Sequence, residues 1–153
     1  MPLAPIAEQW RTTGLGTLGK SSIDSVESGH PLTFVVQEHW ATHHHFDFRL
    51  EMDGVLKSWA VPKGPPETKG VKRLAMAVPD HDLEYGAFEG EIPEGEYGAG
   101  KVSIWDNGTY DLKLRKPDEI AVELHGKRLQ GDYALVLMKK ERDRQMWLLF
   151  KRT

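Results

Sequence analysis

The sequence predicts an all-β protein, and three observations carry the prediction. Short segments of alternating apolar and polar residues recur along the chain, turn residues separate them, and helical periodicity is almost absent after residue 31. This spacing is typical of a small barrel or sandwich, and we predict a closed or partly open barrel of about eight strands. At 153 residues, one domain of this kind buries about 68–70% of its unfolded surface.

The chain is expected to begin with a loose arm over residues 1–31. This stretch is rich in glycine and serine and has no sustained period beyond one short helical turn near Glu8–Thr12. The barrel domain is expected over residues 32–153. Its first two strands are predicted at Thr33–Trp40 and His44–Met52.

The dipeptide Asp53-Gly54 predicts a tight type I′ turn, so Val55–Val61 should return as the second arm of a hairpin. The turn also fixes the register of that hairpin. Four apolar-face pairs are expected: Met52–Val55, Leu50–Lys57, Phe48–Trp59 and Phe46–Val61. The polar-face pairs are Arg49–Ser58 and Asp47–Ala60, and we expect this face to stay open around its small residues.

The later strands are expected at Arg73–Val78, Lys101–Trp105, Thr109–Leu114, Glu119–His125, Asp132–Lys139 and Gln145–Arg152. Pro79-Asp80-His81 is predicted to be a loop. A second, glycine-punctuated loop is predicted at Glu91–Gly100. The tripeptide Asp106-Asn107-Gly108 is predicted to be a hairpin turn.

Composition limits the chemistry and the partners. The chain has no cysteine, so any metal must be bound by histidine or carboxylate side chains. A formal net charge of −3 argues against broad electrostatic adhesion to nucleic acid, although it leaves room for a local phosphate site. No apolar run approaches the roughly 20 residues of a membrane span, and we expect a cytoplasmic protein with no membrane partner.

The segment from His43 to Met52 separates into two faces when read with the period of a strand. One face is polar and consists of His43, His45, Asp47, Arg49 and Glu51. The other is mostly apolar and consists of His44, Phe46, Phe48, Leu50 and Met52.

A divalent metal beside an arginine would explain this polar face. His45 and Asp47 lie two residues apart, so both face the same side of the strand, and antiparallel pairing brings His39 alongside them. The alternatives are a solvent-facing polar strand and a structural histidine held by hydrogen bonds.

Arg49 follows Asp47 on the same face, about 6–7 Å along the strand. Its planar guanidinium suits two phosphate oxygens, but it could equally pair with an acid such as Glu51. His81 lies in a polar segment suited to a catalytic side chain. Lys63 and Arg73 are weaker phosphate candidates, and His30 and His125 are expected at the surface.

Four motifs in order resemble the 3′-phosphoesterase domain family of bacterial ATP-dependent DNA ligase D, which also has free-standing members. They are Phe34–His39 (FVVQEH), His45–Glu51 (HFDFRLE), Trp59–Pro65 (WAVPKGP) and Ile92–Gly100 (IPEGEYGAG). The resemblance runs from about Phe34 to the C-terminus. Several motifs in one chain are far more specific than any one alone.

The resemblance implies a β-barrel enzyme that requires manganese and heals DNA 3′ ends before ligation in double-strand break repair. Such enzymes remove a 3′-terminal phosphate and resect a 3′ ribonucleotide. The implied partners are DNA or RNA-terminated DNA 3′ ends, a DNA ligase and end-joining proteins. Zinc and cobalt also suit the ligand types. Residues 1–31 lack the Arg-Asp pair that assists ribonucleotide removal in the family, so the resemblance supports phosphate removal more directly.

By position, the resemblance assigns roles to eight residues. The metal ligands are His39, His45 and Asp47. The residues that contact phosphate or take part in catalysis are Arg49, His81 and Tyr85, and the supporting basic residues are Lys63 and Arg73.

Two rival functions stay open at this point. A His-x-Asp pair with a distant histidine is also the ligand pattern of Fe(II) oxygenases, which are rich in β structure. Alternatively, the domain is a non-catalytic module that binds DNA ends or a repair partner.

Overall fold

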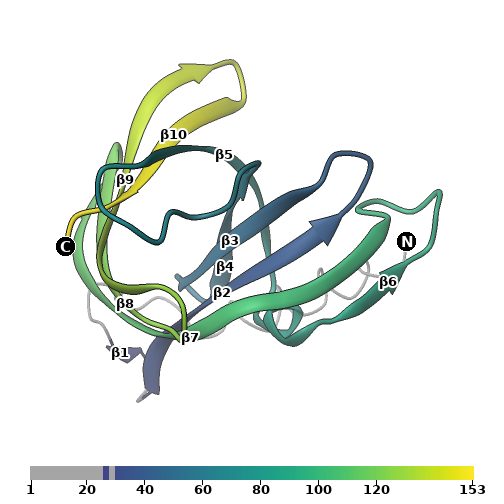
Figure 1. Cartoon of the computed structure of the whole chain (residues 1–153), viewed down its shortest axis with the longest axis horizontal. Coiled ribbons are helices and arrows are strands. Elements are labelled where there is room, and N and C mark those ends of the chain that lie inside the picture. The colour runs from purple at the N-terminus through teal and green to yellow at the C-terminus, as the bar shows by residue number, and fades with distance from the viewer. Residues whose placement is uncertain (1–25, 28–29) are drawn as a thin grey trace.

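Eight antiparallel strands close into a barrel in the computed structural model, which describes residues 26–27 and 30–153 (Figure 1). The strands follow one another around the barrel in the order β2-β3-β4-β5-β10-β9-β8-β7, and β7 pairs with β2 to close it. The prediction of an eight-stranded barrel is therefore confirmed. Their bounds are β2 His30–Trp40, β3 His45–Met52, β4 Val55–Val61, β5 Lys72–His81, β7 Gly100–Lys116, β8 Glu119–His125, β9 Gln130–Glu141 and β10 Arg144–Lys151.

Three short elements complete the part of the chain that the structure describes. Strand β1 (Val26–Glu27) pairs with β2, and β6 (Gly90–Ile92) pairs with the start of β7. A single-turn 3₁₀ helix, η1 (Leu83–Ala87), follows β5. It is too short to cross a bilayer, and no other helix occurs among the described residues.

Alternating side chains fill the barrel interior. Phe48, Leu50 and Met52 of β3 are 0–2% exposed and pack in one apolar cluster with Trp59 of β4 and Trp147 of β10. The indole rings of Trp59 and Trp147 meet edge to face, 5.9 Å between centroids. The apolar face predicted from period two is therefore the core face.

The hairpin between β3 and β4 forms in the predicted register. Asp53 and Gly54 both have positive φ, at 59° and 79°, which is the backbone conformation that a type I′ turn requires. All six predicted cross-strand pairs are observed, including Phe48 with Trp59 and Asp47 with Ala60.

The predicted turn at Asp106-Asn107-Gly108 is wrong, because these residues lie inside the continuous strand β7. The buried carboxylate of Asp106 accepts hydrogen bonds from the backbone N–H groups of residues 127, 128 and 129. Gly108 is needed for close approach, since a Cβ atom there would collide with the carbonyl of His125. Both turn-forming residues thus serve long-range contacts.

Several predicted element bounds also differ. Strand β2 begins at His30, so residues 30 and 31 of the predicted arm are in the sheet, whereas the helical turn predicted near Glu8–Thr12 lies outside the described residues. The predicted loop Glu91–Gly100 begins within β6. Strand β5 continues through Pro79 to His81, because the pairing of β4 with β5 is irregular there and the proline needs no N–H partner in the ladder.

Candidate metal and phosphate site

Three predicted metal ligands converge on the outer face of β2 and β3. His39 pairs with His45 across the two strands, and Gln37 pairs with Asp47, so the two imidazoles and the carboxylate share one face. One ligand atom from each of His39, His45 and Asp47 lies within 4.8 Å of the others. Asp47 Oδ2 is 3.7 Å from His39 Nδ1, and Oδ1 is 3.3 Å from His45 Nε2.

Backbone carbonyls set the protonation of the two imidazole rings. His39 Nε2 lies 2.9 Å from the carbonyl oxygen of Gly98, and His45 Nδ1 lies 2.8 Å from that of His43. Because a carbonyl only accepts, each of these nitrogens must carry a proton. The neutral rings then direct their lone pairs, at His39 Nδ1 and His45 Nε2, toward the carboxylate of Asp47.

Three electron-pair donors facing one another need positive charge between them. Extra protons on the histidines or a divalent cation would supply it, and two imidazole nitrogens with one carboxylate oxygen are a ligand set for manganese, zinc or cobalt. The carbonyl partners are also what metal-bound histidines ordinarily have behind them. The residues present therefore fit a divalent ion.

The electrostatics favour an ionised Asp47 beside a readily protonated His45. Burial alone would raise the pKa of Asp47, but its contacts with the rings of His39 and His45, together with the charge of Arg49, hold the pKa of Asp47 well below its usual range. The hydrogen bond to Asp47 raises the pKa of His45, although burial opposes this. A proton on His45 and a metal ion would therefore compete for the same position beside Asp47.

Arg49 is 3% exposed and lies next to this cluster. Its Nη2 is 3.3 Å from Asp47 Oδ2, its Nε donates to Gln37 Oε1 at 2.6 Å, and its Nη1 donates to Ser58 Oγ at 2.8 Å. Two of these contacts are hydrogen bonds donated by the guanidinium, and the third is an ion pair. Burial lowers the pKa of Arg49, while Asp47 counteracts the shift.

Glu51, the alternative partner considered for Arg49, is engaged elsewhere. Its carboxylate lies 2.8 Å from His30 Nε2 and accepts hydrogen bonds from the backbone and hydroxyl of Thr33. The surface histidine His30 therefore anchors the start of β2, and Arg49 pairs with Asp47.

The polar face of β3 is covered, contrary to the expectation that it stays open. Tyr85 of η1 is 8% exposed, and the Arg49 guanidinium carbon lies 4.9 Å from the centroid of its ring. The ring of His81 stacks on Tyr85 at 4.4 Å and 18°. Burial raises the pKa of Tyr85, although Arg49 opposes this shift. The structure thus brings Arg49, Tyr85 and His81 together.

Gln37 links this cover to the site, and the sequence interpretation missed it. The side chain is fully buried; its amide donates to the carbonyls of Tyr85 at 2.8 Å and Phe88 at 3.2 Å, and its oxygen receives Arg49. The signal was present, because Gln37 precedes His39 by two residues and must share its face.

Residues 37–137 match the sequence model of the family described as the DNA ligase D 3′-phosphoesterase domain. This chain belongs to that family. All eight site residues predicted from the sequence fall within the matched range, so the resemblance noted from its motifs is confirmed.

Similar proteins agree with this membership. The chain is 56% identical, over 114 residues and 72% of its length, to the "Multifunctional non-homologous end joining DNA repair protein LigD" of Mycobacterium tuberculosis. It is 49% identical over 74% of its length to a LigD of Mycolicibacterium smegmatis, and 46% identical over 78% to one of Pseudomonas aeruginosa. It spans only about 15–16% of the length of these relatives.

The two remaining basic residues predicted from the sequence, Lys63 and Arg73, contact each other at the turn after β4. Arg73 shares the inward face of β5 with the core residue Ala75, and its Nη1 donates to the carbonyl of Lys63 at 2.6 Å. A longer contact, 3.4 Å, reaches the carbonyl of Gly64. Arg73 therefore braces the turn after β4, and the exposed Lys63 lies in that turn. Phosphate binding by Lys63 or Arg73 stays a prediction.

Proposed function

We propose that this domain is a metal-dependent 3′-phosphoesterase that removes the terminal phosphate from DNA 3′ ends before ligation in non-homologous end joining. The observation that carries the proposal is the convergence of His39, His45 and Asp47 beside a buried arginine, in a member of the 3′-phosphoesterase family. The family match gives no support to the Fe(II) oxygenase alternative.

In this proposal His39, His45 and Asp47 hold the divalent ion, with manganese as the first candidate. When bound, such an ion neutralises charge on a phosphate and lowers the pKa of water. The protein supplies the other requirements. His39 and His45 are oriented by backbone carbonyls, and the low pKa of Asp47 keeps its carboxylate ionised at neutral pH.

Arg49 is assigned to the phosphate. Phosphoryl transfer depends chiefly on positioning and on neutralising charge at the equatorial oxygens. The contacts with Gln37, Ser58 and Asp47 fix the guanidinium beside the candidate metal ligands, and we assign its charge to the phosphate oxygens. Its positive charge is therefore held in place before the substrate arrives.

His81 and Tyr85 are assigned to the side of the phosphate from which the 3′ oxygen departs. His81 is stacked on Tyr85, and Tyr85 lies against Arg49, so both groups border the same phosphate position. In this proposal His81 donates a proton to the departing 3′ oxygen, and Tyr85 orients the phosphate. Lys63 and Arg73 would add positive charge for the phosphate from the turn after β4.

The test uses a primer–template whose primer ends in a 3′-phosphate and measures its conversion to a 3′-hydroxyl with manganese, zinc or cobalt. The wild type should turn over, and His45→Ala should lose at least about 100-fold. His125→Ala is the matched control, because His125 pairs with Asp111 on an exposed part of the barrel. Full activity of His45→Ala would refute the proposal.

Two further assays determine which DNA ends the enzyme acts on and when. A primer ending in a single ribonucleotide tests ribonucleotide removal, and the same ends presented with a DNA ligase test whether healing precedes sealing. Wild-type binding to these ends without any turnover, with each metal supplied, would instead identify a non-catalytic DNA-end-binding module.

A further inference from the structure

We propose that the basic hairpin formed by the outer ends of β9 and β10 (residues 137–146) holds the DNA backbone behind the 3′ end that enters the site. The inference rests on the proposed function and names a second contact with its substrate. The ligand is a phosphodiester group of the primer strand or of the template strand. Lys139, Arg142 and Arg144 supply the contact.

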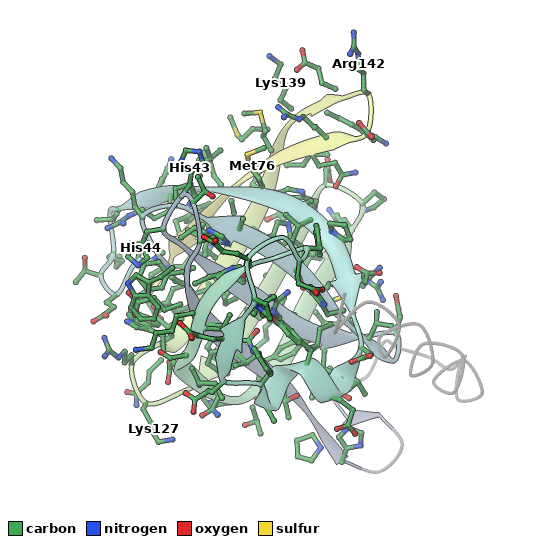
Figure 2. The ribbon with its side chains drawn as sticks, turned by 90° about the vertical axis from the view of Figure 1, so that its right-hand side faces the viewer. His43, His44, Met76, Lys127, Lys139 and Arg142 are labelled. Carbon is green, nitrogen blue, oxygen red and sulfur yellow. The ribbon has the colours of Figure 1, made fainter. Side chains whose placement is uncertain are left out.

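The basic hairpin has no other strand beside it. Beyond Val136, β9 pairs only with β10, and before Met146, β10 pairs only with β9. Figure 1 shows this hairpin projecting past the neighbouring strands, and Figure 2 shows Lys139 and Arg142 toward its end. Its side chains are therefore accessible to a molecule as large as a DNA duplex.

One row of cross-strand pairs connects the basic hairpin with the candidate metal site. Its members pair in turn and are Asp47 of β3, Ala60 of β4, Met76 of β5, Met146 of β10 and Lys139 of β9. Directly paired residues lie on the same face of a sheet, so the row stays on the outer face that carries Asp47. Four strand spacings amount to about 19 Å along the sheet.

Two cations of the basic hairpin lie on this outer face. Arg144 is two residues from Met146 and therefore shares its face. Lys139 shares it as the partner of Met146, because one extra residue shifts the register of β9 at this point. Lys140 follows Lys139 along the strand and lies on the opposite face. The hairpin thus contains its own comparison for a contact on one face.

The charges of the basic hairpin are not neutralised within the protein. Arg142 and Arg144 have no ion-pair partner among the described residues, and Lys139 makes only an exposed contact with Glu141, at 3.6 Å. An exposed pair of this kind contributes little. Residues 139–144 hold four basic and two acidic side chains, a formal charge of +2, whereas the whole chain has −3. Attraction for a polyanion must therefore come from local groups such as these.

Arg142 lies at the turn of the basic hairpin in an unfavourable backbone conformation. Its φ is 54°, in the left-handed region that favours glycine. Asp53 is the one other non-glycine residue with positive φ in the described part of the chain, and aspartate tolerates this region better. An arginine in such a position points to a role for its side chain.

The candidate site is covered on one side and open toward the basic hairpin. On the β2 side, the loop before β7 lies against His39 through the carbonyl of Gly98, and η1 is hydrogen-bonded to Gln37. On the β4 side, the next residue of the row is Ala60, whose side chain is a single methyl group. A nucleic-acid strand whose 3′ phosphate lies in the site therefore leaves across β4 and β5. At about 3.4 Å per nucleotide, it meets the hairpin about five to six nucleotides from its end.

The first experiment measures affinity for a labelled 3′-hydroxyl primer–template by anisotropy between about 50 and 200 mM salt. The triple variant Lys139→Gln/Arg142→Gly/Arg144→Gln loses three cations, so its slope of log affinity against log salt should be smaller by about 2.7. The wild type should therefore lose about 40-fold more affinity than the variant over this range. Equal slopes would overturn the proposal.

Lys140→Gln is the matched control, because it removes one cation from the opposite face of the same hairpin. It should change the slope much less than Arg144→Gln does. Equal effects of these two single substitutions would contradict a contact through the outer face.

Arg142→Gly separates binding from folding. Glycine suits the observed φ, so the unfolding temperature should stay at or above that of the wild type, while the salt slope falls by about 0.9. A variant that binds with the wild-type slope would contradict a phosphate contact at the turn.

Neutral methylphosphonate linkages locate the contact on the DNA. Placed one at a time in either strand, they should weaken wild-type binding about five to six nucleotides from the 3′ end and have little effect there on the triple variant. The strand that shows this difference is the one the hairpin holds. The same sensitivity of both proteins at every linkage would overturn the proposal.

The two proposals fail in distinguishable ways. On 3′-phosphate ends the triple variant should keep its kcat and show a raised KM, because the basic hairpin is remote from the reacting atoms. Wild-type turnover with an unchanged KM and salt slope in the variant overturns the role of the hairpin and leaves the phosphoesterase proposal intact. Absence of wild-type turnover with any metal overturns the phosphoesterase proposal, and the hairpin is then judged by the binding measurements.

Discussion

The two faces of β3 are buried to nearly the same extent, but different forces hold them. The inward residues Phe48 and Leu50 are fully buried among apolar side chains, whereas the outward residues Asp47 and Arg49 are only 7% and 3% exposed within a network of charges and hydrogen bonds. Apolar burial is non-directional and tolerates changes of similar volume. A buried polar network fails when one partner is removed, because the remaining charge is unpaired.

This difference separates stability from chemistry within one strand. The inward face accounts for why the barrel forms, and the outward face costs free energy to bury unless every group finds a partner. Substitutions on the two faces should therefore affect different quantities.

The largest effect on activity is expected from Asp47→Asn. The amide removes the negative charge that holds the two histidines and Arg49 together, so turnover of a 3′-phosphate DNA end should fall by about 100- to 1000-fold or more. A steady-state assay with manganese measures this. Asp111→Asn on the exposed part of the barrel is the control, and equal losses in both variants would contradict the assignment.

Phe48→Ala tests the opposite face. Emptying this core position should lower the free energy of unfolding by about 3–5 kcal/mol, measured by denaturant titration. Activity per folded molecule should stay close to that of the wild type at low temperature. A selective loss of turnover with unchanged stability would show that the two faces are not separable.

Gln37→Leu tests whether Gln37 links Arg49 to the η1 segment that covers it. We expect an intermediate loss of activity. The substitution removes the acceptor of Arg49 Nε and the donor to the carbonyls of Tyr85 and Phe88, so activity should fall by about 10- to 100-fold. Gln37→Glu retains the acceptor for Arg49 and should recover part of that loss. If leucine at this position has no effect, Gln37 does not position Arg49.

Short-range signals in the sequence predicted the two faces of β3 better than they predicted contacts between distant segments. Asp53-Gly54 set the register of the β3–β4 hairpin, and that register with period two placed Asp47 and Arg49 on one face. These inferences needed only neighbouring residues.

Contacts between distant segments were not predictable in the same way. Asp106 and Gly108 looked like a turn, but Asp106 binds the backbone of residues 127–129 and Gly108 accommodates His125. Likewise, nothing local in the sequence indicates that Tyr85 covers Arg49. Composition identifies residues suited to turns or polar contacts, but tertiary packing decides which of these roles each one takes.

The smallest expected effect concerns pH. Because the pKa of His45 is raised in the folded protein, it stabilises the metal-free protein at pH values below 6.5, the ordinary pKa of histidine. This contribution is lost as pH rises through the pKa of the folded state. The lowered pKa of Asp47 contributes stability above its ordinary 3.8, lost as pH falls through the folded value. Since a metal needs neutral His45, manganese should raise the unfolding temperature more at pH 8 than at pH 6.

Scanning calorimetry with and without manganese at the two pH values measures this difference. His45→Ala should remove most of the pH dependence of the manganese effect. A manganese effect that is equal at both values would place the ion away from His45.

The most direct measurement of the central claim is pulsed electron paramagnetic resonance of manganese bound to the protein. The account predicts modulation from two imidazole nitrogens, reduced to one in either His39→Ala or His45→Ala and unchanged in His125→Ala. Bound manganese without any imidazole modulation, or with modulation that survives both substitutions, would contradict it.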